Sequence, residues 1–131
     1  MITSCDKKRV LVAEDNLALL CLIRVTLVEA GCEVMAVQNG EQALAAMREA
    51  DFDLVVTDYQ MPVLDGFGLC KQMREDSRLS EIPVLLLTAK MFELDMDEAQ
   101  QTLGLFSALP KPFSPRELAR LVLERLGCAV T

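Results

Sequence analysis

The sequence predicts an α/β fold, a doubly wound sheet of five parallel strands with five flanking helices. Short apolar segments alternate five times with longer segments of helical periodicity, a rhythm typical of open α/β sheets. The segment Val-Leu-Leu-Leu at residues 84–87 has no polar alternation, as expected of a parallel strand that is covered on both faces. The expected strands are residues 9–13, 33–37, 54–57, 84–88 and 106–109, and the expected helices are residues 17–30, 41–50, 66–75, 95–103 and 114–126.

The first expected helix is apolar on more than one face. Leu20, Ile23 and Leu27 repeat at helical spacing and should face the core. Gly31 follows where a C-terminal glycine is expected. The remaining apolar side chains are either ordinary surface residues or a docking face for a partner helix. These are Leu17, Leu19, Leu22, Val25 and Val28.

Proline, serine and glycine delimit the later elements. Pro83 precedes the fourth strand, where a missing N–H costs least. The last helix has Ser114 as its cap, Pro115 at its first position and Glu117 three residues after the cap. It should end at Gly127, so we expect one domain over residues 1–131 with a core at about 8–127. Its core-facing residues are expected to be Leu118, Leu121, Val122 and Leu126.

Composition excludes several classes of function. The chain of 131 residues has no histidine and a formal charge of −7. Catalytic triads that need histidine and histidine-ligated metals are therefore excluded, and direct binding to nucleic acid or an anionic membrane is disfavoured. The longest apolar run has seven residues, too few to span a bilayer. No signal-peptide pattern follows the N-terminus and no Cys-x-x-Cys pair occurs, so we expect a cytoplasmic protein.

Polar residues gather at the C-terminal ends of the expected strands. Glu14 and Asp15 follow the first strand, Asp58 the third, Thr88 closes the fourth, and Lys111 follows the fifth. In doubly wound sheets, ligands bind outside these strand ends. We expect the flavodoxin-like strand order 2-1-3-4-5, in which the first and third strands are neighbours. The three carboxylates would then converge.

Converging carboxylates predict a bound cation, because each like-charge pair at ~4 Å costs about 4 kcal/mol at an effective dielectric of 20. All available ligands are oxygens, which favours Mg²⁺ (or Mn²⁺), with Asp15 and Asp58 as direct ligands and Glu14 acting through water. Asp58 could also attack phosphorus as a nucleophile. Lys111 would offset the phosphoryl charge, and the Thr88 hydroxyl would hydrogen-bond a phosphoryl oxygen. A cis bond between Lys111 and Pro112 would orient the lysine.

Four segments in order give a resemblance to a known family. They are Val-Leu-Val-Ala-Glu-Asp-Asn at 10–16, Leu-Val-Val-Thr-Asp-Tyr-Gln-Met-Pro at 54–62 with Asp-Gly at 65–66, Leu-Leu-Leu-Thr-Ala at 85–89, and Lys-Pro-Phe at 111–113. Together they resemble the receiver domains of two-component response regulators, over nearly the whole chain.

The resemblance implies a phosphoacceptor switch rather than an enzyme. Asp58 matches the phosphorylated aspartate, Glu14 and Asp15 the acidic metal pocket, and Thr88 and Lys111 the residues that meet the phosphoryl group. Gln60 would supply a backbone carbonyl to Mg²⁺. The donor would be a phosphohistidine on a sensor histidine kinase or a histidine phosphotransfer protein. The downstream protein target is not specified, and we expect no output domain.

The sequence departs from this family at two places. Ala108 stands where the family usually has a tyrosine or phenylalanine, and Phe106 lies two residues earlier. Pro110 also precedes Lys111 and stiffens the loop. In residues 90–105, apolar side chains could pack onto the core or form a Met-rich partner surface. These are Met91, Phe92, Leu94 and Met96.

Three other functions compete with the switch. A degenerate receiver that serves only as an interaction scaffold is the first alternative, supported mainly by Ala108. An aspartate-nucleophile phosphatase is less favoured, because such enzymes usually carry a general-acid aspartate where this chain has Gln60. Flavin binding is disfavoured because Glu14 and Asp15 would repel its phosphate.

Overall fold

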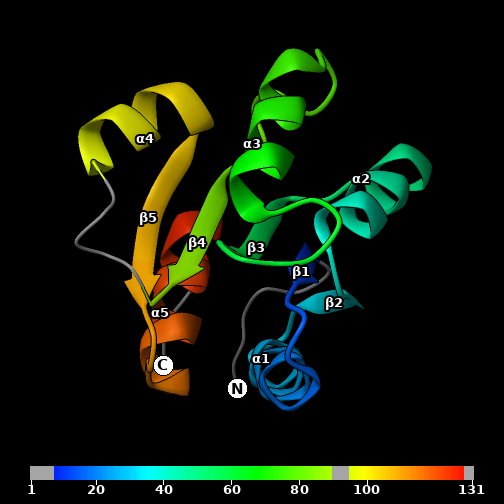
Figure 1. Cartoon of the computed structure of the whole chain (residues 1–131). Helices are drawn as coiled ribbons and strands as arrows, with labels where there is room; N and C mark the ends of the chain where they lie inside the picture. The colour runs from blue at the N-terminus through cyan, green and yellow to red at the C-terminus, as the bar shows by residue number, and fades with distance from the viewer. Residues whose placement is uncertain (1–7, 90–94, 129–131) are drawn as a thin grey trace.

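The computed structural model describes residues 8–89 and 95–128. Five parallel strands form one sheet in the order β2-β1-β3-β4-β5, which confirms the predicted order (Figure 1). The strands are β1 Arg9–Ala13, β2 Glu33–Val37, β3 Leu54–Asp58, β4 Val84–Thr88 and β5 Leu105–Pro110. The helices are α1 Leu17–Glu29, α2 Gly40–Glu49, α3 Gly66–Glu75, α4 Met96–Leu103 and α5 Pro115–Leu126.

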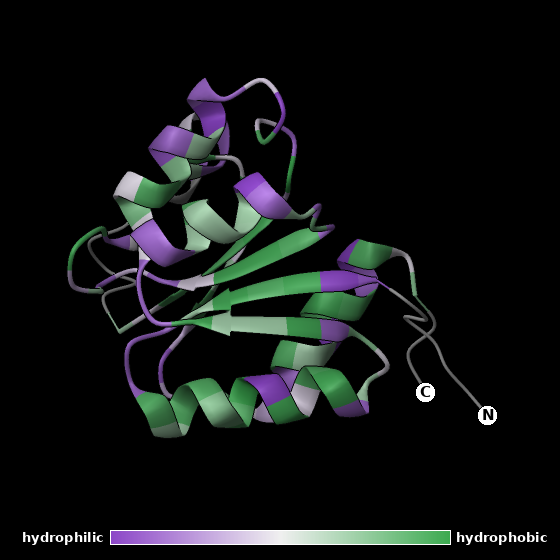
Figure 2. Cartoon of the chain, turned by 90° about the vertical axis from the view of Figure 1, so that its right-hand side faces the viewer, coloured by the Kyte–Doolittle hydropathy of each residue, from purple (hydrophilic) through white to green (hydrophobic). Residues whose placement is uncertain are grey.

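The strands carry alternate side chains into two cores, one on each face of the sheet. Leu11 and Ala13 of β1 belong to the core under α2, α3 and α4, whereas Val10 and Val12 belong to the core under α1 and α5. Figure 2 shows strands that are hydrophobic along most of their length, between helices on both sides. Because both faces are covered, parallel strands read as continuous apolar runs, as the sequence predicted.

Most element boundaries agree with the expected ones, and those of β1, β2, β4 and α3 are identical to them. β3 reaches one residue further, to Asp58, and β5 begins at Leu105 and ends at Pro110. Pro110 pairs with Thr88 at the edge of the sheet, where a residue without an N–H is tolerated. Each helix begins after a residue whose side chain accepts a hydrogen bond from the first turn. These caps are Asn16, Asn39, Asp65, Asp95 and Ser114.

Helix α1 buries the predicted stripe and exposes a second apolar one. Leu20, Ile23 and Leu27 are buried in the core. Leu17 is 63% exposed, and other exposed apolar residues continue along the outer side of the helix. They are Leu22, Val25 and Val28. The docking face proposed for these residues stays a hypothesis.

Helices α4 and α5 cover opposite faces of the sheet. In α5, Leu118 and Val122 are buried, and Leu121 and Leu126 are half-buried against the same core, as predicted. Most of the predicted Met-rich surface, Met91 to Leu94 together with the side chain of Met96, lies outside the described residues. Within the described chain, no helix combines the length and the apolar character needed to cross a bilayer.

Candidate functional site

Three carboxylates meet at the C-terminal edge of the central strands. β1 pairs with β3, so Glu14 and Asp15, which follow β1, lie beside Asp58 at the end of β3. One carboxylate oxygen from each of the three lies within 4.8 Å of the others. Glu14 and Asp58 are only 1% and 6% exposed, whereas Asp15 faces solvent. The predicted convergence is therefore present.

Lys111 joins this acidic cluster from the loop after β5. Its Nζ lies 2.9 Å from Glu14 Oε1 and 3.0 Å from Asp58 Oδ1. The backbone N–H of Lys111 donates to the carbonyl of Thr88 at 2.9 Å, which ties the loop to the end of β4. The peptide bond between Lys111 and Pro112 is cis. The Lys111 ammonium group thus contacts two buried carboxylates at once.

Backbone contacts hold Glu14 in place. Its N–H donates to the carbonyl of Val37 at 3.1 Å, which extends the pairing of β1 with β2 by one residue. The N–H of Asn16 donates to Glu14 Oε2 at 3.1 Å, and the Asn16 side chain accepts from Leu19 N at 3.0 Å. Asn16 is not among the predicted site residues. An asparagine directly before an apolar helical pattern is the cap signal that could have revealed it.

Burial and the neighbouring opposite charges have opposite effects on the pKa values of Glu14 and Lys111. Burial raises the pKa of the Glu14 carboxyl and the nearby charge of Asp58 adds to the rise, although Lys111 and the Asn16 N–H pull it down. For Lys111, burial alone would lower the pKa, but hydrogen bonds to Glu14 and Asp58 and their charges raise it overall. Lys111 is therefore an ammonium ion at neutral pH, and the cluster keeps an excess of negative charge that favours a second cation.

Thr88 and Gln60 lie at or just after the ends of two neighbouring strands, β4 and β3. Thr88 is buried at the end of β4, one residue beyond Leu87, which pairs with Asp58. Gln60 lies in the exposed loop two residues after Asp58, and its role as a carbonyl ligand stays a prediction. Ala108 is half-buried in the core under α2, α3 and α4, whereas Phe106 packs on the opposite face, beneath the guanidinium of Arg125. Phe106 therefore does not fill the position of the missing aromatic residue.

Comparison with known proteins places this arrangement in a family. Residues 10–123 match the model of the response regulator receiver domain. The chain belongs to this family. The receiver domain is 36% identical over 123 residues to a probable transcriptional regulator, ycf27, of Pyropia yezoensis, and 37% identical over 125 residues to the sensor protein GacS of Pseudomonas syringae. These matches cover 92% and 93% of the chain, but only 49% and 14% of the respective relatives.

Solved receiver structures share the fold along their whole length. The receiver domain of a sensor histidine kinase from Pseudomonas aeruginosa, solved with magnesium coordinated in its active-site cleft, superposes with a TM-score of 0.82 at 29% identity. The chemotaxis response regulator CheY4 of Vibrio cholerae gives a TM-score of 0.79 at 32% identity. Each comparison covers 92% of this chain and 98% of the other.

The donor set of this receiver domain suits the same kind of ion. Its three converging ligands are all carboxylate oxygens, and Mg²⁺ binds through one or two carboxylates while keeping several waters. The exposed Asp15 leaves the cluster open on one side to water and ligands. Softer metals would need nitrogen or sulfur donors, and no such donor accompanies the three carboxylates in the described chain.

Proposed function

We propose that this receiver domain takes a phosphoryl group onto Asp58 from a phosphohistidine on a sensor histidine kinase or a histidine phosphotransfer protein. The observation that supports this most directly is the double contact of Lys111 with Glu14 and Asp58 at 2.9 and 3.0 Å. A carboxylate beside both a lysine and an acidic metal pocket has what an attacking group needs in phosphoryl transfer. The 131 residues contain no histidine, so the donor histidine lies outside this sequence.

Each residue would have a defined part in the transfer. An Oδ atom of Asp58 attacks phosphorus, the P–N bond to the donor breaks, and its electron pair stays on the imidazole nitrogen. Mg²⁺ held by Glu14, Asp15, Asp58 and the Gln60 carbonyl would neutralise charge on the phosphoryl oxygens. Lys111 contacts Asp58 already and needs only a small movement to donate to a phosphoryl oxygen.

Thr88 would complete the binding of the phosphoryl group. It stands at the end of the strand next to β3 and shares a backbone hydrogen bond with Lys111. A hydroxyl at this position can donate to a phosphoryl oxygen once Asp58 is modified. Phosphorylation would thereby be coupled to the ends of β4 and β5, and through them to partner binding.

The loop after Asp58 favours a lasting modification over turnover. Gln60 cannot donate a proton as a carboxylic acid does, so the aspartyl phosphate would not be hydrolysed by a dedicated general acid at this position. We therefore propose a regulatory switch and not a phosphatase. We also propose a cytoplasmic location and no direct binding to nucleic acid or membranes, as the sequence predicts.

A receiver that serves only as a scaffold is the second candidate. Ala108 favours it, because the half-buried alanine offers no aromatic ring to change position with Thr88. Under that alternative the partner surface would be the same whether or not Asp58 is modified. Phosphorylation therefore separates the two candidates.

The test is intact-mass measurement after incubation with acetyl phosphate and Mg²⁺. We expect one added phosphoryl group on the wild type and none on Asp58→Asn. The exposed Asp97→Asn variant removes the same charge away from the site and should behave as the wild type. An absence of adduct with acetyl phosphate and with phosphohistidine donors would favour the scaffold. Steady phosphate release from several phosphate esters would indicate a phosphatase.

A further inference from the structure

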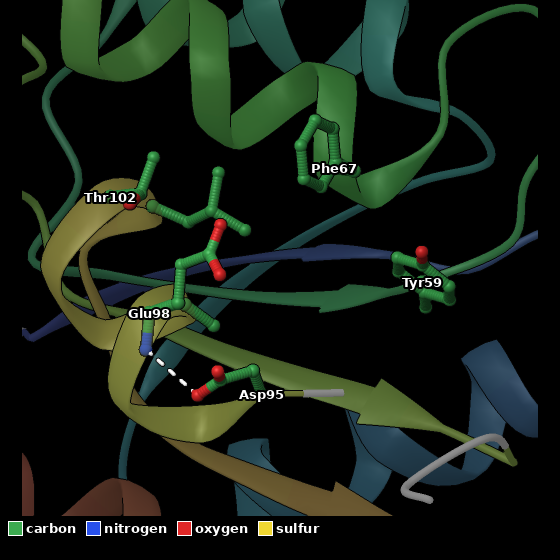
Figure 3. Close-up of a pocket in the computed structure, with 7 residues that line it drawn as sticks. Tyr59, Phe67, Asp95, Glu98 and Thr102 are labelled. Carbon is green, nitrogen blue, oxygen red and sulfur yellow. Dashed lines mark hydrogen bonds between the residues drawn. The ribbon is translucent and has the colours of Figure 1, made fainter. Parts of the chain in front are cut away.

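A cavity separate from the acidic cluster lies between α3 and α4. Its volume is about 210 Å³. Figure 3 shows Phe67 projecting from α3 and Glu98 from α4 toward the same space, with Tyr59 at the end of β3. Drug-sized ligands occupy pockets of roughly 300–1,000 Å³, so this volume suits a smaller ligand with about one ring.

Apolar and aromatic side chains form much of the cavity lining, and Thr102 adds a hydroxyl. Ala99 and Leu103 of α4 are buried and line it, and Tyr59 and Phe67 contribute aromatic rings. The backbone of Tyr59 is fixed on both sides, because its N–H donates to the Leu87 carbonyl at 2.8 Å and its carbonyl accepts from Gly66 N at 2.9 Å. A flat apolar group would lose little by entering, since the walls are already in place.

The charged groups at the rim are both acidic. Asp95 and Glu98 line the cavity, and neither forms an ion pair with a lysine or arginine of the described chain. Asp95 is partly engaged, since its Oδ1 accepts from the Glu98 N–H at 3.1 Å (Figure 3). The Glu98 carboxylate therefore remains as the group that could bind a ligand. Aromatic faces attract cations as well. Lys71 Nζ lies 6.0 Å from the Phe67 ring centroid but does not line the cavity.

We propose that this cavity binds a small organic cation with a flat apolar body, such as an arylamidinium. The apolar body would lie on Ala99 and Leu103 between the two rings, and the cationic end would pair with Glu98. Anions are disfavoured because both charged groups at the rim are negative. A neutral ring would gain the apolar contacts but not the charge pairing. The proposal does not depend on phosphorylation of Asp58.

Benzamidine is the test ligand, and its neutral isostere benzamide is the control. In a titration followed by ¹H–¹⁵N NMR, we expect benzamidine to shift the amide signals of Phe67, Ala99 and Leu103. Benzamide should bind at least about fivefold more weakly, since it lacks the charge. The same loss is expected for benzamidine with Glu98→Gln, which retains the shape of the side chain.

Asp97→Asn is the matched variant, because it removes one exposed carboxylate from the same turn of α4 without touching the cavity. It should bind benzamidine as the wild type does. Well-dispersed spectra of both variants would show that they are folded. The proposal is overturned if benzamidine leaves these amide signals unchanged, if benzamide binds equally well, or if Asp97→Asn and Glu98→Gln weaken binding equally. Loss of Asp58 phosphorylation in a separate assay would leave this result unaffected.

Discussion

Lys111 Nζ lies 2.9 Å from Glu14 Oε1, across 97 positions of sequence, and 3.0 Å from Asp58 Oδ1. Both carboxylates are buried, so without this ammonium group they would repel each other in a poorly hydrated setting. The two carboxylates lie together at the strand ends, where a phosphoryl group and a cation would bind.

Lys111→Met should destabilise the fold by about 3 kcal/mol in metal-free buffer, because it leaves two buried carboxylates without their shared cation. The loss should be smaller in Mg²⁺, which would supply positive charge to the same oxygens. Urea denaturation with and without Mg²⁺ measures both values. Lys71→Met, at an exposed position of α3, is the control and should change stability by less than about 0.5 kcal/mol. An equal loss with and without Mg²⁺ would contradict the shared site.

Mg²⁺ should raise the melting temperature of the wild type. A ligand at a hundred times its dissociation constant stabilises the native state by about 2.7 kcal/mol. Asp15→Asn should greatly reduce this effect while slightly stabilising the metal-free protein, because it removes one of three converging charges. Differential scanning calorimetry across a Mg²⁺ series gives the comparison. If Asp15→Asn responds to Mg²⁺ like the wild type, Asp15 is not a ligand.

Two glycines with the same backbone conformation should respond differently to alanine. Gly104 has φ 72° and Gly127 has φ 75°, and alanine at either position costs roughly 1 kcal/mol for the left-handed backbone. A Cβ on Gly104 would also lie 2.4 Å from Arg74 Cζ, whereas one on Gly127 meets nothing within 4 Å.

Arg74 cannot move aside cheaply, because its guanidinium donates to the carbonyls of Leu103, Ser80 and Ile82. Gly104→Ala should therefore cost about 2 kcal/mol more than Gly127→Ala, through disturbed hydrogen bonds. Chemical denaturation of both variants gives the difference. Equal costs would mean that Arg74 adjusts freely.

Val63 offers a stabilising substitution. It has φ 69° and is 74% exposed, so a β-branched residue holds a strained conformation with little packing to offset it. Val63→Gly should stabilise the fold by about 0.5–1 kcal/mol, after allowing for the flexibility that glycine adds to the unfolded chain. The same substitution at Val25 in α1 should instead destabilise it. Thermal denaturation distinguishes the signs, and destabilisation by Val63→Gly would refute the strain.

The free cysteines should differ in reactivity. Burial raises the pKa of Cys32 to about 11 and that of Cys70 to about 12, whereas Cys21 is exposed. When the pKa of a thiol is raised, only a small fraction is the reactive thiolate at pH values well below that pKa. The thiolate fraction increases only as the pH approaches the pKa. Iodoacetamide at pH 8 should therefore label Cys21 and spare Cys32 and Cys70 in the native protein. Peptide mapping reads the three sites, and labelling of Cys70 at the rate of Cys21 would contradict its burial.

Local chemistry explains why so much of the fold was predictable. Continuous apolar segments indicate strands covered on both faces. Caps such as Ser114 fix where a helix begins, because their side chains accept hydrogen bonds from the first turn. The observed strand ends differ from the predicted ones by only one residue, as at Asp58 and Leu105. The difference arises because hydrogen bonding to a neighbouring strand decides where pairing stops.

The sequence by itself determined the strand and helix pattern and the set of residues at the strand ends, because periodicity and caps are local and the family motifs are ordered along the chain. The strand order was predicted by likeness to flavodoxin-like sheets and is confirmed by the strand pairing. Only the tertiary structure decided that Lys111 contacts both Glu14 and Asp58, that Phe106 faces away from the position of Ala108, and that a cavity opens beside Tyr59. These depend on how side chains from distant segments pack across the sheet, and no local pattern encodes that geometry.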